Sequence, residues 1–219
     1  KSIILNHRMI PMRNRKKTLE VTIEEMKNFS FAYIEKYAPS KQQLRTYLLK
    51  KYLKASNPNV KKQDITDLID IVLVDLEKNK FISDKFYSES KSRSLIQRGS
   101  SINKIRSYLF SKGVNDNYIK ETVEKIKEDN EDQDFFSGIK ICKKKRIGPA
   151  RAEDNRPLFY KKDISLLARN GFDFETSKRI MDIDKNDYIK IIKLLWFIFF
   201  FFFQVINFIS YIVFYKNKD

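Results

Sequence analysis

Cysteine, histidine, glycine and proline are all scarce in this chain of 219 residues, and each scarcity excludes some chemistry. The only cysteine is Cys142 and the only histidine is His7. A Cys/His zinc site, a disulfide framework and a Ser-His-Asp relay are therefore excluded or nearly so, and a lone thiol fits a reducing compartment. The five glycines stand apart from one another, so no phosphate-binding glycine motif can be written. We predict a protein that is not an enzyme and holds no metal and no cofactor.

Positive charge is what the chain has in excess. Lys and Arg number 44 against 28 Asp and Glu, which gives a formal net charge of +16 and a pI near 9.7. This balance favours a polyanionic or acidic partner, such as nucleic acid, an anionic membrane or an acidic protein face. A purely compositional origin of the charge stays open. The arginines are the better indicators, because the guanidinium group recognises phosphate and carboxylate in two-pronged geometry.

The N-terminal segment gives little information about the fold. The first residue is Lys1, while Met9 and Met12 follow closely, and we expect translation to start at one of them. The apolar stretch at the start is too short for a secretory signal. We interpret residues 1–28 as a basic tail.

Apolar periodicity predicts helices throughout the rest of the chain. Six residues at helical spacing form one stripe on a helix from about residue 64 to 79: Ile65, Leu68, Ile69, Val72, Leu73 and Leu76. Ser40 and Gln43 have the spacing of a capping box, and Ser101 and Asn115 or Asp116 are expected to cap later helices. Gly113 and Gly171 are expected to end helices in the left-handed conformation.

An internal repeat organises these helices into three groups of three. Residues 44–49 align with residues 105–110 at an offset of 61, and a weaker third copy starts at Ile164. Helices at 29–37, 84–98 and 134–145 are predicted before the copies, and helices at 65–79, 116–129 and 174–182 after them. We predict an all-α fold of three tandem three-helix repeats, at 29–80, 81–130 and 131–190. Short helices are marginal alone, so we expect the repeats to stack into an elongated body.

Four segments of the chain carry the pattern of a known family. The segment 84–90 with Arg93 resembles a D-[ER]-[FY]-A-x-[AS] helix, and 99–114 resembles a G-x-x-x-I-R-x-x-L-x-x-K-G-[IV] helix. The segment 33–40 with Arg45 resembles an opening found in alphaproteobacterial members, and 166–174 resembles the closing L-x-R-[RK]-G-F-x-[FY] signature. Together they resemble the RecX family of recombination regulators. The run Gly99-Ser100-Ser101 departs from the family pattern, which has proline there.

The resemblance to the RecX family implies a function by binding rather than by chemistry. Members bind the filament that RecA forms on single-stranded DNA and mostly inhibit RecA recombinase activity, which regulates DNA repair and the SOS response. The resemblance also implies a curved body of three repeats. A cytoplasmic monomer with the RecA filament and its single-stranded DNA as partners is what we expect.

The candidate binding residues are the cations of the repeated helices and of the segment 140–162. That segment holds nine Lys or Arg against two acids. Arg45, Arg106 and Arg169 recur at matching repeat positions. At such a position an arginine either contacts a helical binding partner or pairs with a group inside the protein. A charge run is also commonly just solvated surface. The full set of candidates for binding RecA or DNA is Arg45, Arg93, Arg98, Lys104, Arg106, Lys112, Lys143, Lys144, Lys145, Arg146, Arg151 and Arg169.

The segment 191–219 is an apolar tail that lies outside the resemblance. The segment from Leu194 to Tyr215 contains no charged residue and is flanked by basic residues. It is long enough for a membrane-spanning helix. Phe199 to Phe203 are five consecutive phenylalanines, which a T-rich stretch of DNA read through a lost stop codon would encode. An inner-membrane tether and a non-native read-through are thus both open.

Two other functions remain open beside RecA regulation. A general nucleic-acid-binding helical protein would need only the net charge, and it would bind naked DNA tightly without RecA. A membrane-anchored helical adaptor would place the basic body against anionic lipid.

Overall fold

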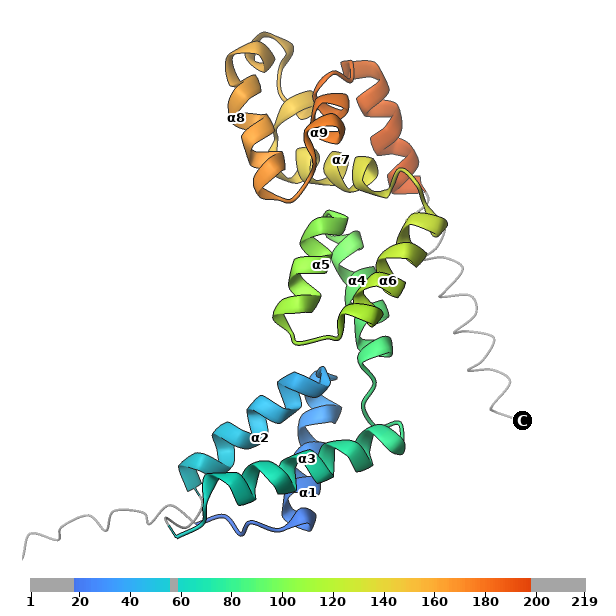
Figure 1. Cartoon of the computed structure of the whole chain (residues 1–219). Helices are drawn as coiled ribbons and strands as arrows, with labels where there is room; N and C mark the ends of the chain where they lie inside the picture. Colours follow the sequence, from blue (N-terminus) through green and yellow to red (C-terminus); the bar gives the residue numbers. More distant parts are fainter. Residues whose placement is uncertain (1–17, 56–58, 198–219) are drawn as a thin grey trace, which may run out of the picture. The chain divides into compact units, whose positions relative to one another are not determined.

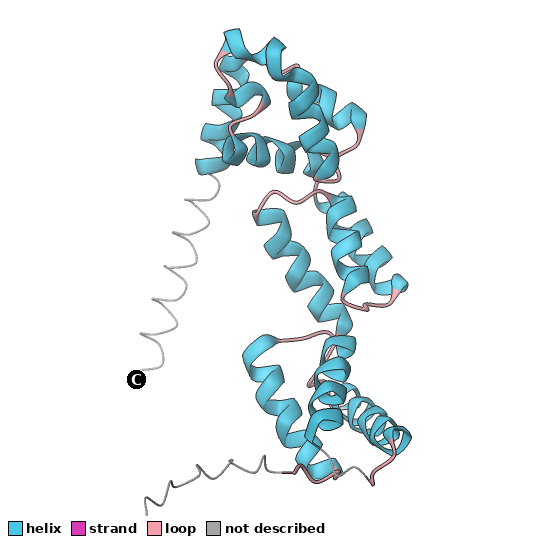
Figure 2. Cartoon of the chain, turned by 90° about the vertical axis from the view of Figure 1, so that its left-hand side faces the viewer, coloured by secondary structure: helices cyan, strands magenta, loops and turns pink. Residues whose placement is uncertain are grey.

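The computed structural model describes residues 18–55 and 59–197, which contain helices and no β-strand (Figure 2). The all-α prediction is thus confirmed for the described part of the chain. Nine α-helices are labelled in Figure 1: α1 Ile23–Tyr37, α2 Lys41–Ala55, α3 Lys62–Lys78, α4 Asp84–Gln97, α5 Ile102–Ser111, α6 Asp116–Asp129, α7 Gln133–Lys145, α8 Arg156–Arg169 and α9 Phe174–Met181. Two 3₁₀ turns, Gly148–Ala150 and Glu153–Asn155, join α7 to α8, and a further helix is described over 185–197.

The predicted caps begin and end these helices. The backbone N–H of Ser40 donates to the Gln43 side chain at 3.1 Å, while the N–H of Gln43 donates to the Ser40 hydroxyl at 3.2 Å. This reciprocal pair is the predicted capping box at the start of α2. Ser101 and Asn115 cap α5 and α6 through their side-chain oxygens. Gly113 and Gly171 follow α5 and α8 with φ of +70° and +87°, a conformation that glycine adopts without a Cβ penalty.

Two helix starts lie earlier than the sequence pattern predicts. The basic tail predicted for residues 1–28 ends too late, since residues 23–28 belong to α1 and Met26 is fully buried. Thr22 caps this helix, as its hydroxyl accepts from the N–H of Glu25 at 3.3 Å. Helix α8 begins at Arg156, eight residues before the third copy of the repeat, because Pro157 fits the first helical turn.

The chain divides into two compact units, with the boundary between Ser83 and Asp84. The first unit is the triad α1–α3. The predicted apolar stripe of α3 forms part of its core, in which Leu44, Leu48 and Tyr52 of α2 are also fully buried. Each such side chain contributes roughly 1.5–3 kcal/mol by leaving water. The stripe predicted for residues 64–79 is thus a core face.

The second unit contains two triads, each with its own core. Ile105 and Leu109 of α5 are fully buried against α4 and α6 in one cluster. Ile139 of α7, Leu167 of α8 and Ile180 of α9 are fully buried in the other. Buried apolar side chains thus gather once per predicted triad, although the division of the chain into three separate domains stays a prediction.

Backbone contacts join the two triads of the second unit closely. The hydroxyl of Ser101 donates to the carbonyl of Asn170 at 2.8 Å, and the N–H of Ile102 donates to the carboxylate of Asp134 at 2.8 Å. A Cβ on Gly171 would lie 2.5 Å from the Ser101 hydroxyl oxygen, and a Cβ on Gly99 would lie 2.9 Å from the carbonyl oxygen of Ser137. The two glycines therefore permit close contact that any side chain would block.

The described start of the apolar tail belongs to the core of the third triad. Ile191, Ile192 and Leu195 lie on the helix over 185–197 and pack, partly buried, against the cluster of α7–α9. The sequence pattern did not predict this packing. Among the described residues, no helix is long and apolar enough to cross a membrane. Most of the predicted span from Leu194 to Tyr215, including the run of phenylalanines, lies outside the described residues.

Candidate functional site

Two of the twelve candidate cations are held by acids inside the protein. Arg45 of α2 forms a two-pronged ion pair with Asp70 of α3, with nitrogen–oxygen distances of 2.7 and 2.9 Å. The hydrogen bond to Arg45 lowers the pKa of Asp70. This pairing lies within the first unit and ties two helices of one triad together. Of the two roles considered for the repeated arginines, Arg45 therefore has the internal one.

Arg151 is the second cation with an internal partner. Its guanidinium donates to both carboxylate oxygens of Asp163, at 2.6 and 2.9 Å, and lies 4.3 Å from the centre of the Phe159 ring. Asp163 is 1% exposed and also accepts from the N–H of Gly148 at 2.8 Å. Burial raises the pKa of Asp163, but these hydrogen bonds outweigh it and hold the pKa below its ordinary value. Arg151 therefore helps fix the connection between α7 and α8.

Two candidate lysines, Lys104 and Lys112, make contacts with side chains of the protein. The ammonium of Lys104 donates to the side-chain oxygen of Asn170 at 3.0 Å, across the junction of the two triads. The ammonium of Lys112 lies 5.2 Å from the centre of the Tyr108 ring, within the range of a cation–π contact. Lys104 is nevertheless exposed, so its charge still contributes to the surface potential.

The other eight candidates are exposed, and none makes an ion pair or side-chain hydrogen bond with another described residue: Arg93, Arg98, Arg106, Lys143, Lys144, Lys145, Arg146 and Arg169. Lys143 to Lys145 form the last turn of α7, where cations interact favourably with the helix dipole. A structural reason thus exists for the three lysines and for Arg169 in the last turn of α8, while Arg93, Arg98 and Arg106 have none in the described part. Exposed cations of this kind can meet phosphate or carboxylate groups.

A groove between α5 and α6 brings one of these arginines next to an exposed aromatic ring. The groove has a volume of about 430 Å³ and is lined by Arg106, Ser107, Phe110, Asp116, Ile119 and Lys120. Ile119 is buried beneath it, whereas Phe110 is 69% exposed. Phe110 and Lys120 were not among the predicted site residues. The alignment of the repeats could have drawn attention to Phe110, because the matching residue of the first repeat is the aliphatic Leu49.

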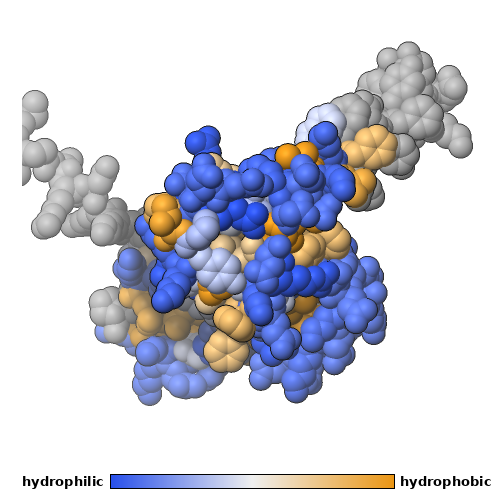
Figure 3. Space-filling model, turned by 90° about the horizontal axis from the view of Figure 1, so that it is seen from above, coloured by the Kyte–Doolittle hydropathy of each residue, from blue (hydrophilic) through white to orange (hydrophobic). Residues whose placement is uncertain are grey.

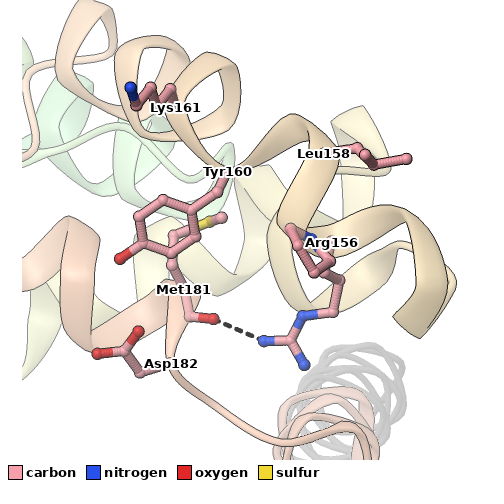
Figure 4. A pocket seen from close by; sticks show the side chains of 7 residues that line it. Arg156, Leu158, Tyr160, Lys161, Met181 and Asp182 are labelled. Atoms are coloured by element: carbon pink, nitrogen blue, oxygen red, sulfur yellow. Dashed lines mark hydrogen bonds between the residues drawn. The ribbon is translucent and has the colours of Figure 1, made fainter.

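A second hollow lies between α8 and the end of α9, and some of its lining groups make internal contacts (Figure 4). The guanidinium of Arg156 donates to the carbonyls of Met181 and Ile183 at 2.6 and 2.7 Å, which satisfies acceptors at the end of α9. Burial and the neighbouring Asp182 raise the pKa of Tyr160, so the phenol stays protonated at neutral pH. The polar groups of this hollow serve the fold rather than a ligand.

The surface view shows the same character as the residue contacts. Seen from above, the visible face of the described residues is mostly hydrophilic, with small hydrophobic areas between the polar side chains (Figure 3). No group of three or more His, Cys, Asp or Glu residues within the described ranges is placed to hold a metal ion. The arrangement offers charged surface for binding.

The comparisons with known proteins agree with the sequence motifs. No protein-family model and no solved structure matches the chain. A curated relative, the regulatory protein RecX of Myxococcus xanthus, is 27% identical over 177 residues, which cover 78% of this chain and 91% of the relative. The alignment thus spans nearly the whole relative, at a length that four short motifs alone would not produce. The alphaproteobacterial type stays a prediction. This relative confirms the resemblance of the chain to the RecX family.

Proposed function

We propose that this protein regulates a RecA recombinase by binding the filament that RecA forms on single-stranded DNA, and that it mostly inhibits recombinase activity. The observation that carries the proposal is the exposure of Arg93, Arg106 and Arg169, which lie in the family motifs and have no internal partner among the described residues. The name of the Myxococcus relative supports a regulatory role. Action on RecA rests on the family resemblance.

The proposed action is binding without chemistry. Cations that contact phosphates release condensed counterions, so affinity rises at low salt without a fixed base sequence. A monomer in the cytoplasm, where filaments form on damaged chromosomal DNA, would limit filament growth and thereby DNA repair and the SOS response. The twelve candidate cations stay predictions for this contact, with Arg45 and Arg151 the weakest because Asp70 and Asp163 already hold them.

The experiment that tests this proposal is single-strand-dependent ATP hydrolysis by the cognate RecA, titrated with the full chain. We expect inhibition at fewer protein molecules than RecA subunits, because one molecule that blocks filament growth affects many subunits. Affinity for the bare oligonucleotide, measured by fluorescence anisotropy in the same buffer, should be at least tenfold weaker than affinity for the filament. Full ATPase activity at saturating protein would refute the proposal.

A general nucleic-acid-binding protein is the second candidate, and the net charge of +16 favours it. It predicts equal affinity for bare and RecA-coated single strands, with a steep loss at high salt. The two titrations above therefore separate the candidates. The membrane-anchored adaptor depends on the segment 194–215, most of which lies outside the described residues. Liposome binding that disappears in high salt or without this segment would favour it.

A further inference from the structure

The groove between α5 and α6 lies at the repeat position where the first triad forms its internal ion pair, Arg45–Asp70. Arg106 and Phe110 align with Arg45 and Leu49 of the first repeat. In the first triad, Asp70 holds Arg45 in a two-pronged pair, and Leu49 packs partly buried against the core. In the second triad, Phe110 is 69% exposed and Arg106 makes no ion pair with a described residue. The second triad thus lacks, among the described residues, the ion pair and the aliphatic packing that the first triad has at these two positions.

The α6 helix supplies no acid to Arg106 in the way that α3 does to Arg45. Aligning the buried residues Ile65 and Ile69 with Ile119 and Val123 puts Glu124 at the position of Asp70. No ion pair joins Arg106 to Glu124 or to Asp116 within the described residues. Lys120, one turn before Glu124, adds a second exposed cation to the groove, whose lining then carries two cations and one acid. The groove lining therefore carries net positive charge, and Arg106 has no carboxylate partner among the described residues.

We propose that the groove between α5 and α6 receives an acidic segment of the protein partner, in which a carboxylate pairs with Arg106 and a neighbouring aliphatic side chain covers Phe110. The Arg45–Asp70 pair shows this geometry inside the same chain. A planar guanidinium binds a carboxylate through two parallel hydrogen bonds, and an exposed aromatic ring next to it gains from covering by apolar atoms. The inference deepens the proposed function, on which it rests, by assigning Arg106 to the protein part of the filament and not to its DNA.

The test uses the full chain and two substitutions in the groove. Arg106→Lys keeps the positive charge but removes the two-pronged geometry, and Phe110→Ala removes the ring. Each should lower affinity for RecA filaments by about tenfold, since buried arginine and aromatic contacts dominate interfaces. Affinity for a bare oligo-dT strand should change less than twofold. Phe174→Ala, which removes an exposed phenylalanine of α9 outside the groove, is the matched control.

Two results would overturn the groove assignment while leaving the proposed function intact. Unchanged filament affinity in both groove variants is one. A parallel loss for filament and bare strand is the other, because it would mean that the groove meets DNA phosphates. Circular dichroism checks that each variant folds, as expected for exposed side chains.

A peptide-binding measurement tests whether the groove binds an acidic segment even if the wild-type chain fails to bind filaments. A labelled peptide of alternating Glu and Leu should bind at least tenfold more tightly than the same peptide with Gln in place of Glu, and Arg106→Gln, which removes the cation, should reduce that preference. Equal binding of the two peptides to the wild-type chain would contradict the inference. Failure of the filament measurement alone would count against RecA as the partner.

Discussion

The same residue type serves different purposes at matched positions of this chain. Arg45 is held by Asp70, whereas Arg106, at the same repeat position, is exposed without a partner among the described residues. What differs is the neighbouring helix: an acid of α3 pairs with Arg45, whereas no acid of α6 forms an ion pair with Arg106. The position in the repeat therefore places the guanidinium, but only the acid opposite decides whether it is free to bind a partner.

Asp163 is the side chain whose loss we expect to be most costly among the charged residues discussed here. Asp163→Asn should lower the free energy of unfolding by about 2–3 kcal/mol, because Arg151 would lose its acid partner beside a buried site. Urea unfolding followed by circular dichroism measures this change. Asp154→Asn, an exposed acid in the 3₁₀ turn of the same connection, should change stability by less than about 0.5 kcal/mol.

The dependence on pH gives the same prediction a second measurement. The pKa of Asp163 is lowered in the folded chain, so its contribution to stability is complete above its unfolded pKa of about 3.9. That contribution is lost as the pH falls through the lower, folded value. Wild-type and Asp163→Asn stabilities should therefore converge in acid. A difference that persists undiminished at pH 2 would show that the ionised carboxylate is not its source.

Helix ends, more than helix interiors, join the two triads of the second unit. Ser101 accepts from the N–H of Lys104 and donates to the carbonyl of Asn170, so one hydroxyl both begins α5 and holds the loop after α8. Asp134 of α7 contacts the start of the same helix. The departure from the family pattern at Gly99-Ser100-Ser101 thus retains a helix cap and a close contact.

Ser101→Ala should therefore cost more than the loss of an ordinary cap. We expect a decrease of about 2 kcal/mol in the free energy of unfolding, as both hydrogen bonds of the hydroxyl disappear. Asn115→Ala, which removes only the exposed cap of α6, should cost about 1 kcal/mol. Thermal and urea unfolding of the two variants give the comparison. Equal costs would mean that the bond to Asn170 adds nothing.

The charge of the whole chain sets how strongly it is attracted to a polyanion, while the placement of single cations sets where. Lys143, Lys144 and Lys145 are exposed in the last turn of α7, and the dipole of that helix already accounts for their presence. Whether they also contact the filament depends on local geometry, which a change in net charge alone does not test.

A triple charge reversal separates these two effects. Lys143→Glu/Lys144→Glu/Lys145→Glu should weaken filament binding at least tenfold and flatten its dependence on salt, because about three phosphate contacts would be lost. Lys50→Glu/Lys54→Glu/Lys61→Glu makes the same change in net charge at exposed positions of the first unit and should weaken binding much less. Filament affinities measured across a salt series decide between them. Equal effects would remove the α7 lysines from the interface.

The sequence by itself determined the helical content and the resemblance to the RecX family, and it predicted the grouping of helices in threes. Helical periodicity and capping residues act over a few positions, so Ser40, Ser101 and Gly171 could be interpreted without knowing the fold. Two helix starts escaped this reasoning, because Met26 of α1 is held by packing and α8 begins eight residues before the third copy of the repeat.

Only the tertiary structure decided which cations are engaged and which remain exposed. The partners of Arg45 and Arg151 lie 25 and 12 residues away, and a local charge pattern does not show such pairings. The same holds for Phe110, whose exposure depends on how α6 packs against α5. Short-range preferences fix the elements of this protein, whereas contacts between distant residues determine its candidate interface.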